Sequence, residues 1–234
     1  MNTPTCGSSH LRNEDYHKNY SVKKFFQQIV SKSKPIIFDV GAHKGESINF
    51  FKKIYPKSII HCFEPNPVIY NELSKININD VFKHNIAISD KEGESEFFTQ
   101  DMSHLGGLLE INKKAKDSLG YAENALNKKI KVKTTTLDNF CLINKINNID
   151  ILKIDVQGYE IGVLKGGKKI LNSIDCVSVE VSLYDFYKDS DSSILNVELI
   201  MKDSGLVLWD ISHIAKNPKN FRTDWVELVY RREK

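Results

Sequence analysis

Three acidic side chains lie at or just after the ends of apolar segments, at points where the chain then turns. Asp39 ends the run that starts at Ile36, Glu64 follows a second run, and Asp155 lies near the end of a third. If these runs form parallel strands, their carboxyl ends meet at one edge of a sheet, where open sheets of this kind bind ligands. A carboxylate after the second strand is placed to accept two hydrogen bonds from a ribose diol, which predicts that role for Glu64.

The turn after Asp39 separates two classes of nucleoside ligand. It has the sequence G-A-H-K-G over residues 41–45. Dinucleotide-binding turns have the spacing G-x-G-x-x-G, in which the second glycine lets the backbone approach a pyrophosphate, and that spacing is absent. S-adenosylmethionine has no phosphate and needs a helix start for its carboxylate, an acid for its ammonium group and an acid for its ribose. Asp39 or Asp155, together with Glu64, would meet these needs, so the turn favours S-adenosylmethionine.

Alternating strands and helices must hold these acids. Apolar runs separated by helical periodicity predict a parallel sheet that is covered on both faces by right-handed crossovers. The predicted core strands are residues 36–40, 58–63, 81–88, 150–156 and 175–181. The predicted helices are residues 46–54, 68–76, 137–146, 160–171 and 193–203. The last two predicted strands, 205–211 and 224–231, have no helical pattern between them and should therefore form an antiparallel pair.

A long segment interrupts this alternation. Residues 93–99 and 130–135 are predicted strands, and the connection 101–127 between them is polar and contains Gly106-Gly107. A connection of that length, placed over the carboxyl edge of the sheet, indicates a lid or an acceptor-binding segment. A disordered loop is the alternative.

The composition is that of an ordinary globular protein, with 234 residues and a formal net charge of +3. A balanced charge gives no broad basic face for nucleic acid or anionic membrane. No apolar stretch approaches the roughly 20 residues of a membrane span, and the four cysteines lack metal-ligand spacing. We therefore expect a cytoplasmic protein with reduced thiols. We expect residues 1–34 to be an extension with one short helix at 21–30 and no regular structure in 1–19, and residues 35–234 to be the functional domain.

Four ordered blocks within residues 36–180 resemble the FkbM-type class I methyltransferases. They are D-V-G-A-H-K-G at 39–45, F-E-P-N-P at 63–67, N-I-A-I-S-D at 85–90 with Gly93, and L-K-I-D-V-Q-G-Y-E at 152–160 with V-L-K-G at 163–166. The resemblance implies an α/β, Rossmann-like fold: a mostly parallel seven-stranded sheet with an antiparallel terminal strand, helices on both faces and an inserted lid-like segment between strands 3 and 4. It also implies transfer of a methyl group from S-adenosylmethionine to a hydroxyl of a sugar, glycan or secondary metabolite.

The resemblance also assigns residues to the parts of the methyl donor. Asp39, Gly41 and His43 would contact its methionine end, Glu64 its ribose and residues 85–89 its adenine. Asp155 would lie beside the methyl group and the acceptor. The full predicted donor site consists of Asp39, Gly41, Ala42, His43, Gly45, Ser47, Glu64, Pro65, Asn85, Ala87, Ser89 and Asp155.

Two positions depart from the family pattern. The family often has asparagine where His43 stands, and glutamate where Gln157 stands. A metal-binding or acid–base role at position 157 is therefore not expected here, although glutamine can still form hydrogen bonds.

Methylation of an alcohol needs a group that takes up the hydroxyl proton. Our hypothesis is that Asp155 orients or deprotonates the hydroxyl, assisted by Glu180, Lys153 or His104. In one variant of this hypothesis, Asp155 and Glu180 hold a divalent metal ion. The structural alternative is that Asp155 only caps the helix that follows it.

Two other functions stay open at this point. A nicotinamide-dependent sugar-nucleotide oxidoreductase would use a Tyr-x-x-x-Lys pair, and Tyr184 and Lys188 have that spacing. A non-catalytic nucleoside-binding module would bind its ligand without turnover. For an enzyme we expect a small-molecule or glycan acceptor rather than nucleic acid, and the sequence does not indicate an oligomeric state.

Overall fold

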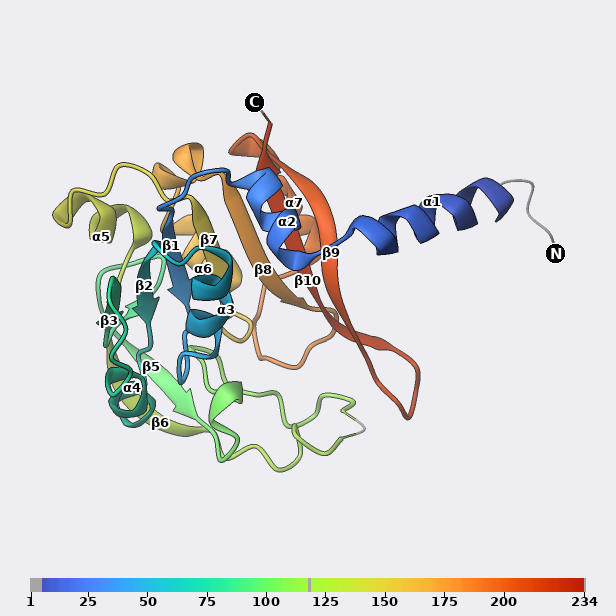
Figure 1. The fold of residues 1–234 in the computed structure, drawn as a ribbon. Helices are drawn as coiled ribbons and strands as arrows, with labels where there is room; N and C mark the ends of the chain where they lie inside the picture. The colour runs from blue at the N-terminus through green and yellow to red at the C-terminus, as the bar shows by residue number, and fades with distance from the viewer. Residues whose placement is uncertain (1–5, 118, 234) are drawn as a thin grey trace.

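The apolar runs form the middle of a seven-stranded sheet. The computed structural model describes residues 6–117 and 119–233, and the strand order is β3-β2-β1-β7-β8-β10-β9 (Figure 1). Neighbours among β3, β2, β1, β7 and β8 are parallel, whereas β10 is antiparallel to both β8 and β9. The strands are β1 (Ile36–Val40), β2 (Ile59–Phe63), β3 (Val81–His84), β7 (Ile151–Ile154), β8 (Cys176–Ser182), β9 (Leu206–Lys216) and β10 (Thr223–Arg232). The predicted fold class, including its antiparallel terminal strands, is confirmed.

Helices cover both faces of this sheet because side chains alternate along each strand. On β1, Ile37 packs in a cluster with residues of helices α2 (Val22–Ile29), α3 (Glu46–Ile54) and α4 (Pro67–Ser74). The next residue, Phe38, belongs to the cluster on the opposite face. That cluster contains residues of α5 (Leu137–Ile143), α6 (Glu160–Lys165), the short helix η2 (Ile170–Ser173) and α7 (Ile194–Asp203).

A second, smaller sheet departs from the prediction. It contains β4 (Ala87–Ile88), β5 (Gly93–Thr99) and β6 (Lys128–Thr135) in the order β4-β6-β5. The prediction of one strand over residues 81–88 is therefore wrong, because the chain leaves the main sheet after His84. The Asn85 side chain fixes this break by donating hydrogen bonds to the carbonyl oxygens of Glu64 and Pro65, at 2.9 and 3.0 Å.

One helix was not predicted, and two predicted helices end earlier in the structure. Residues 6–19 form helix α1 (Cys6–Asn19), which projects from the rest of the fold (Figure 1), whereas residues 1–5 lie outside the described part. This helix is polar all round and so has no apolar period that could reveal it. Helix α5 ends at Ile143 rather than 146, and α6 ends at Lys165 rather than 171. Helix α6 stops where Gly166 passes so close to the Ser89 carbonyl that a Cβ there would lie 2.0 Å from its oxygen.

Helix character and the state of the cysteine thiols are the two structural features that relate to the predicted cellular location. Within residues 6–117 and 119–233, no helix combines the length and apolar character that a bilayer crossing requires. Cys62, Cys141 and Cys176 are buried and have free thiols. Burial raises the pKa of the Cys176 thiol to about 12, so this thiol is protonated at neutral pH.

Gly41 joins the end of β1 to the turn that follows. Its φ is +86°, and a Cβ at this position would lie 1.8 Å from the backbone carbonyl oxygen of Asp155 on the neighbouring connection. The glycine is therefore needed for contact between two strand ends as well as for the turn.

We expect Gly41→Ala to lower the free energy of unfolding by about 3 kcal/mol, because it adds a backbone clash to an unfavourable positive φ. Gly120→Ala is the matched control, since its φ of +81° is similar and its nearest non-neighbouring atom, Asn124 Nδ2, lies 3.4 Å away. The control should cost only about 1 kcal/mol. Chemical denaturation measures both values, and equal costs would show that contact with Asp155 does not explain the glycine.

Candidate functional site

A cavity of about 510 Å³ lies at the carboxyl ends of β1, β2 and β7. Its lining comes from the ends of these strands and the turns after them, from the small sheet at β4 and β5, from the excursion 101–127, from β8 and the segment after it, and from the facing ends of β9 and β10. The connection between β9 and β10 lies at the same end of the sheet as the excursion (Figure 1). The cavity therefore occupies the position that the sequence predicts for a ligand.

The structure brings most of the predicted site residues to this cavity and leaves four outside its lining. Residues in the lining are Gly41, Ala42, His43, Ser47, Glu64, Pro65, Ala87, His104, Asp155 and Glu180. Residues outside the lining are Asp39, Gly45, Asn85 and Ser89. Gly45 is the N-cap residue before α3, and a Cβ there would meet the side chains of Ile76 and Ile48. Ser89 is fully buried beside Gly166.

Glu64 is a buried carboxylate held by two backbone amides. Its Oε2 accepts a hydrogen bond from His43 N–H at 3.1 Å, and its Oε1 accepts one from Asn66 N–H at 2.8 Å. Each oxygen keeps a further lone pair for a ligand hydroxyl. Burial raises the pKa of Glu64 to about 7, although the two amides oppose this rise. Glu64 therefore changes from its neutral to its negatively charged form close to neutral pH.

His43 joins the turn to the excursion. Its φ is +47°, its Nδ1 lies 2.9 Å from Glu46 Oε1, and its Nε2 lies 2.8 Å from Ser103 Oγ. Ser103 begins the short helix η1 (Ser103–Leu105), whose His104 ring meets the His43 ring edge-on with centroids 6.5 Å apart. His43 thus connects the turn after β1 to η1, and both His43 and His104 line the cavity.

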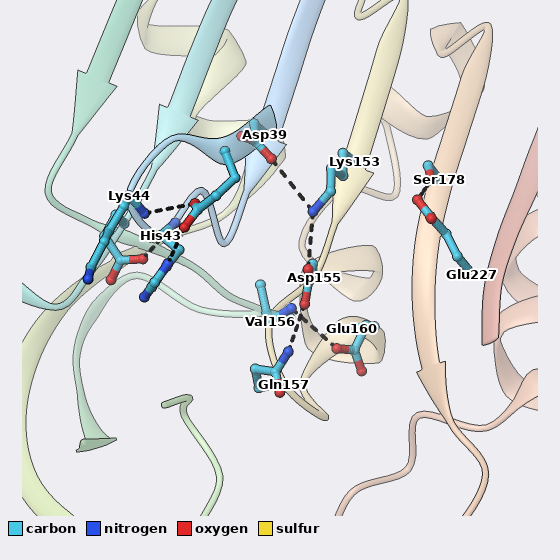
Figure 2. Close-up of polar contacts among 12 residues, drawn as sticks. Asp39, His43, Lys44, Lys153, Asp155, Val156, Gln157, Glu160, Ser178 and Glu227 are labelled. Carbon is cyan, nitrogen blue, oxygen red and sulfur yellow. Dashed lines mark hydrogen bonds and ion pairs between the residues drawn. The ribbon is translucent and has the colours of Figure 1, made fainter. Parts of the chain in front are cut away.

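Two carboxylates share one lysine at the centre of the site. Lys153 Nζ lies 3.2 Å from Asp155 Oδ2 and 3.9 Å from Asp39 Oδ1, and Figure 2 shows the lysine between the two acids. Burial lowers the pKa of Lys153, but Asp155 and Asp39 more than offset this and keep it raised, so the lysine is charged. Asp39 is fully buried, and among the described residues neither of its carboxylate oxygens has a hydrogen-bond partner.

Asp155 makes side-chain contacts that differ from helix capping. Its Oδ1 accepts a hydrogen bond from Gln157 Nε2 at 2.7 Å, while its Oδ2 faces Lys153. The backbone amide of Val156 donates instead to Glu160 Oε1 at 3.3 Å (Figure 2). The backbone amide of Gly158 donates to the same oxygen at 3.0 Å. Glu160, rather than Asp155, therefore accepts the hydrogen bonds of the backbone amides just before α6, and Asp155 lines the cavity.

Glu180 on β8 adds a second carboxyl group to the cavity lining. Burial, reinforced by the nearby charges of Asp155 and Glu160, raises its pKa well above the ordinary value. Across the strand pair, Glu180 is opposite Glu227, which accepts a hydrogen bond from Ser178 at 2.6 Å. In the part of the chain that the structure describes, no group of three or more His, Cys, Asp or Glu side chains is arranged to hold a metal ion.

The excursion forms the roof of the cavity and is fixed to the body at several points. Ile111 forms an isolated antiparallel bridge with Tyr187, and Asn112 N–H donates to the Phe186 carbonyl at 2.8 Å. The Arg222 guanidinium stacks on Tyr184 at 3.8 Å and donates to the Lys116 carbonyl at 3.1 Å. The excursion thus occupies the place of a lid.

Several cavity residues carry no signal in the sequence. Tyr121 lies in the excursion, Ser182 and Tyr187 lie in or after β8, and Lys216 and Trp225 lie on the two strands of the terminal hairpin. None belongs to a recognisable motif, because only long-range packing brings these segments together. The alternating pattern of 224–231 predicts a strand but not its approach to the cavity.

Comparisons with known proteins agree with this geometry. The model of the methyltransferase FkbM domain family matches residues 39–208. The chain is 29% identical over 189 residues to "2-O-methyltransferase NoeI" of Sinorhizobium fredii, with 75% of this chain and 76% of that protein covered. It is 27% identical over 157 residues to "Methyltransferase sdnD" of Sordaria araneosa, with 57% and 61% covered.

One solved structure supports the fold. The crystal structure of methyltransferase FkbM from Methylobacillus flagellatus KT superposes with a TM-score of 0.52 at 12% identity. The match covers 85% of this chain and 44% of that chain, so this chain spans less than half of the crystallised protein.

Proposed function

The chain belongs to the FkbM methyltransferase family, and on that premise we propose that it transfers a methyl group from S-adenosylmethionine to a hydroxyl group of a sugar, glycan or secondary metabolite. The observation that carries this proposal is the shared cavity, which has the Glu64 carboxylate at one part of its wall and the Asp155 carboxylate at another. The relative named as a 2-O-methyltransferase supports transfer to oxygen.

The residues present fit a methyl donor. Asp39 lies outside the cavity lining, and its buried carboxylate, 3.9 Å from Lys153 Nζ and without hydrogen-bond partners among the described residues, would favour an ammonium group in the adjoining cavity through its charge rather than by direct contact. Glu64 has free lone pairs for a ribose diol. The apolar residues in the same lining, which suit an adenine ring, are Ile86, Ala87, Ile88, Phe97 and Leu108. Gly41, His43 and Ser47 would lie along the methionine part.

The chain's own residues supply the acid–base chemistry. S-adenosylmethionine, when bound, supplies a methyl group on a positively charged sulfur, whose bonding electrons remain on sulfur after transfer. Asp155 accepts the acceptor's hydroxyl proton as the hydroxyl oxygen bonds to the methyl carbon, and it aligns that oxygen. Lys153 keeps one carboxylate oxygen of Asp155 in place at 3.2 Å. Glu180 and His104 line the same cavity and would assist in binding the acceptor or moving its proton.

The acceptor end of the cavity suits a polar molecule with ring faces. Aromatic side chains and polar groups occur together in its wall, namely Tyr121, Ser182, Tyr184, Phe186, Lys216 and Trp225. Aromatic faces contact the apolar faces of a ring, and the polar groups form hydrogen bonds with its hydroxyls. We therefore propose sugars as the first class of acceptor to test. We do not propose nucleic acids as acceptors.

The other functions have less support. In a reductase of the Tyr-x-x-x-Lys type, both side chains would face the ligand. Here Tyr184 lines the cavity, but Lys188 pairs with Glu110 at 2.8 Å and is not in the cavity lining. A non-catalytic binding module would have the same cavity as the enzyme, so only a measurement of turnover distinguishes these two functions. A metal-assisted variant would use Asp155 and Glu180, and a chelator would abolish its activity. We also propose a cytoplasmic location, which the buried free thiols support.

The first test is ligand binding to the whole chain. We expect calorimetric titration to give micromolar affinity for S-adenosylhomocysteine, on the order of 8 kcal/mol of binding free energy, and no measurable binding of NAD. A screen of nucleotide sugars and glycans with S-adenosylmethionine then identifies the acceptor by release of S-adenosylhomocysteine. Binding of NAD in place of S-adenosylhomocysteine would refute the proposal, and binding without turnover on any acceptor class would favour the silent module.

A further inference from the structure

Tyr187 is a buried residue of the cavity wall that the reaction described above does not use. It is 5% exposed, and its hydroxyl donates a hydrogen bond to Gln157 Oε1 and lies 3.5 Å from the Leu105 carbonyl oxygen. Its side chain packs closely against Gly158, where a Cβ would come within 2.7 Å of the Tyr187 ring. Both the ring and the hydroxyl of Tyr187 are therefore fixed.

Gln157 links this hydroxyl to the reacting carboxylate. Its φ is +60°, a conformation that residues other than glycine rarely adopt, and its Nε2 donates to Asp155 Oδ1 at 2.7 Å (Figure 2). An amide has one accepting and one donating end. With Oε1 held by the Tyr187 proton, the donating end faces Asp155, and the reverse orientation would place two oxygens against each other. Tyr187 thus fixes which end of Gln157 meets the carboxylate.

The excursion in turn holds Tyr187. The backbone of Tyr187 bridges to Ile111, and the next residue, Lys188, donates its N–H to the Glu110 carbonyl at 2.8 Å. The side chain of Lys188 also pairs with the Glu110 carboxylate. A displaced excursion would release these contacts and free the Tyr187 hydroxyl.

We propose that Tyr187 is a positioning residue that aligns Asp155 through Gln157. Because the excursion holds Tyr187, the position of the reacting carboxylate then depends on the contacts between the excursion and Tyr187. This inference rests on the proposed function. Lys153 and Gln157 each occupy one oxygen of Asp155, which leaves one lone pair on each oxygen for the acceptor hydroxyl. Loss of the Tyr187 hydroxyl removes the hydrogen bond that holds Gln157 Oε1, so that Asp155 is then held by Lys153 and by a less constrained Gln157.

Tyr187→Phe tests this role because it keeps the ring on Gly158 and removes only the hydroxyl. With the acceptor from the screen, we expect kcat to fall about tenfold while the KM for S-adenosylmethionine changes less than about twofold. Tyr55→Phe is the control, since the Tyr55 hydroxyl donates to the Val30 carbonyl at 2.9 Å in a buried cluster away from the cavity. It should leave kcat unchanged. Equal kcat for Tyr187→Phe and wild type would overturn the proposal.

Gln157→Glu tests the link by its effect on pH dependence. The substitution puts a second carboxylate beside Asp155, and a like charge at that distance favours protonation. We expect the acidic limb of the kcat profile to move up by about one pH unit. An unchanged profile would show that position 157 does not act on the reacting group.

A third measurement needs no acceptor. If Tyr187 acts on Asp155 through Gln157, the effects of Tyr187→Phe and Asp155→Asn on the melting temperature are not additive. The melting temperature of the double variant should then fall by less than the sum of the two single decreases. Additive shifts would refute the link. Absence of S-adenosylhomocysteine binding by the wild type would instead refute the proposed function, and the melting cycle would still report on the link.

Discussion

Asp155→Asn is expected to lower kcat by about 10³-fold while the affinity for S-adenosylhomocysteine changes less than about threefold. Asparagine has nearly the same shape, but its amide cannot take up a proton. It also cannot accept hydrogen bonds on both sides, where Lys153 and Gln157 now donate at 3.2 and 2.7 Å. Single-turnover kinetics with the identified acceptor measure the rate, and calorimetry measures the binding.

The control for this variant is Asp191→Asn. Asp191 also pairs with a lysine, Lys165, at 2.9 Å, but it lies outside the cavity lining. Its loss should leave kcat unaltered, because an exposed pair of this kind contributes little. A rate for Asp155→Asn close to that of wild type, in a variant that still binds S-adenosylhomocysteine, would remove Asp155 from the mechanism and leave Glu180 as the next candidate base.

Glu64→Gln is expected to weaken S-adenosylhomocysteine binding by about 100-fold, because two charge-assisted hydrogen bonds to the ribose become weaker or are lost. In the wild type, affinity should also depend on pH. Burial raises the pKa of Glu64 to about 7, so the binding-competent carboxylate forms as the pH rises through that value. The apparent affinity should therefore be roughly tenfold higher at pH 8 than at pH 6.

Titrations of both proteins at the two pH values check this prediction. The glutamine variant should show weak binding without this pH dependence, because the titrating group is gone. Glu72→Gln serves as the control, since Glu72 is an exposed acid paired with Lys75 at 2.6 Å. Wild-type affinity that stays constant from pH 6 to pH 8 would mean that Glu64 does not contact the ligand.

The parts of the site that follow short motifs were predictable from the sequence. Asp39, Glu64 and Asp155 each follow from an apolar run and a turn, and the sheet brings the ends of these runs together. The sequence also predicts the antiparallel terminal strands, because no helical pattern that could form a crossover lies between them. These features depend on residues close to one another in sequence.

The remaining features depend on contacts that no local pattern encodes. The break after His84 needs the Asn85 side chain to find the Glu64 carbonyl. The place of Tyr187 depends on its bridge to Ile111, far back in the chain, and the roof of the cavity depends on Arg222 reaching Lys116. Helix α1 has no apolar face and so leaves no periodic signal at all.

The excursion packs around a small apolar cluster that includes Ile111 and Phe186, whereas the main sheet has large cores on both faces. Such a region can open as a cooperative unit while the main sheet stays intact. The amides of Asn112 and Lys188, which donate hydrogen bonds beside the Ile111–Tyr187 bridge, should therefore exchange with deuterium well before those of β1 and β7. A bound nucleoside would slow that exchange, because binding would stabilise the closed excursion against opening. Ligand binding and the local folding of the excursion would then be thermodynamically linked.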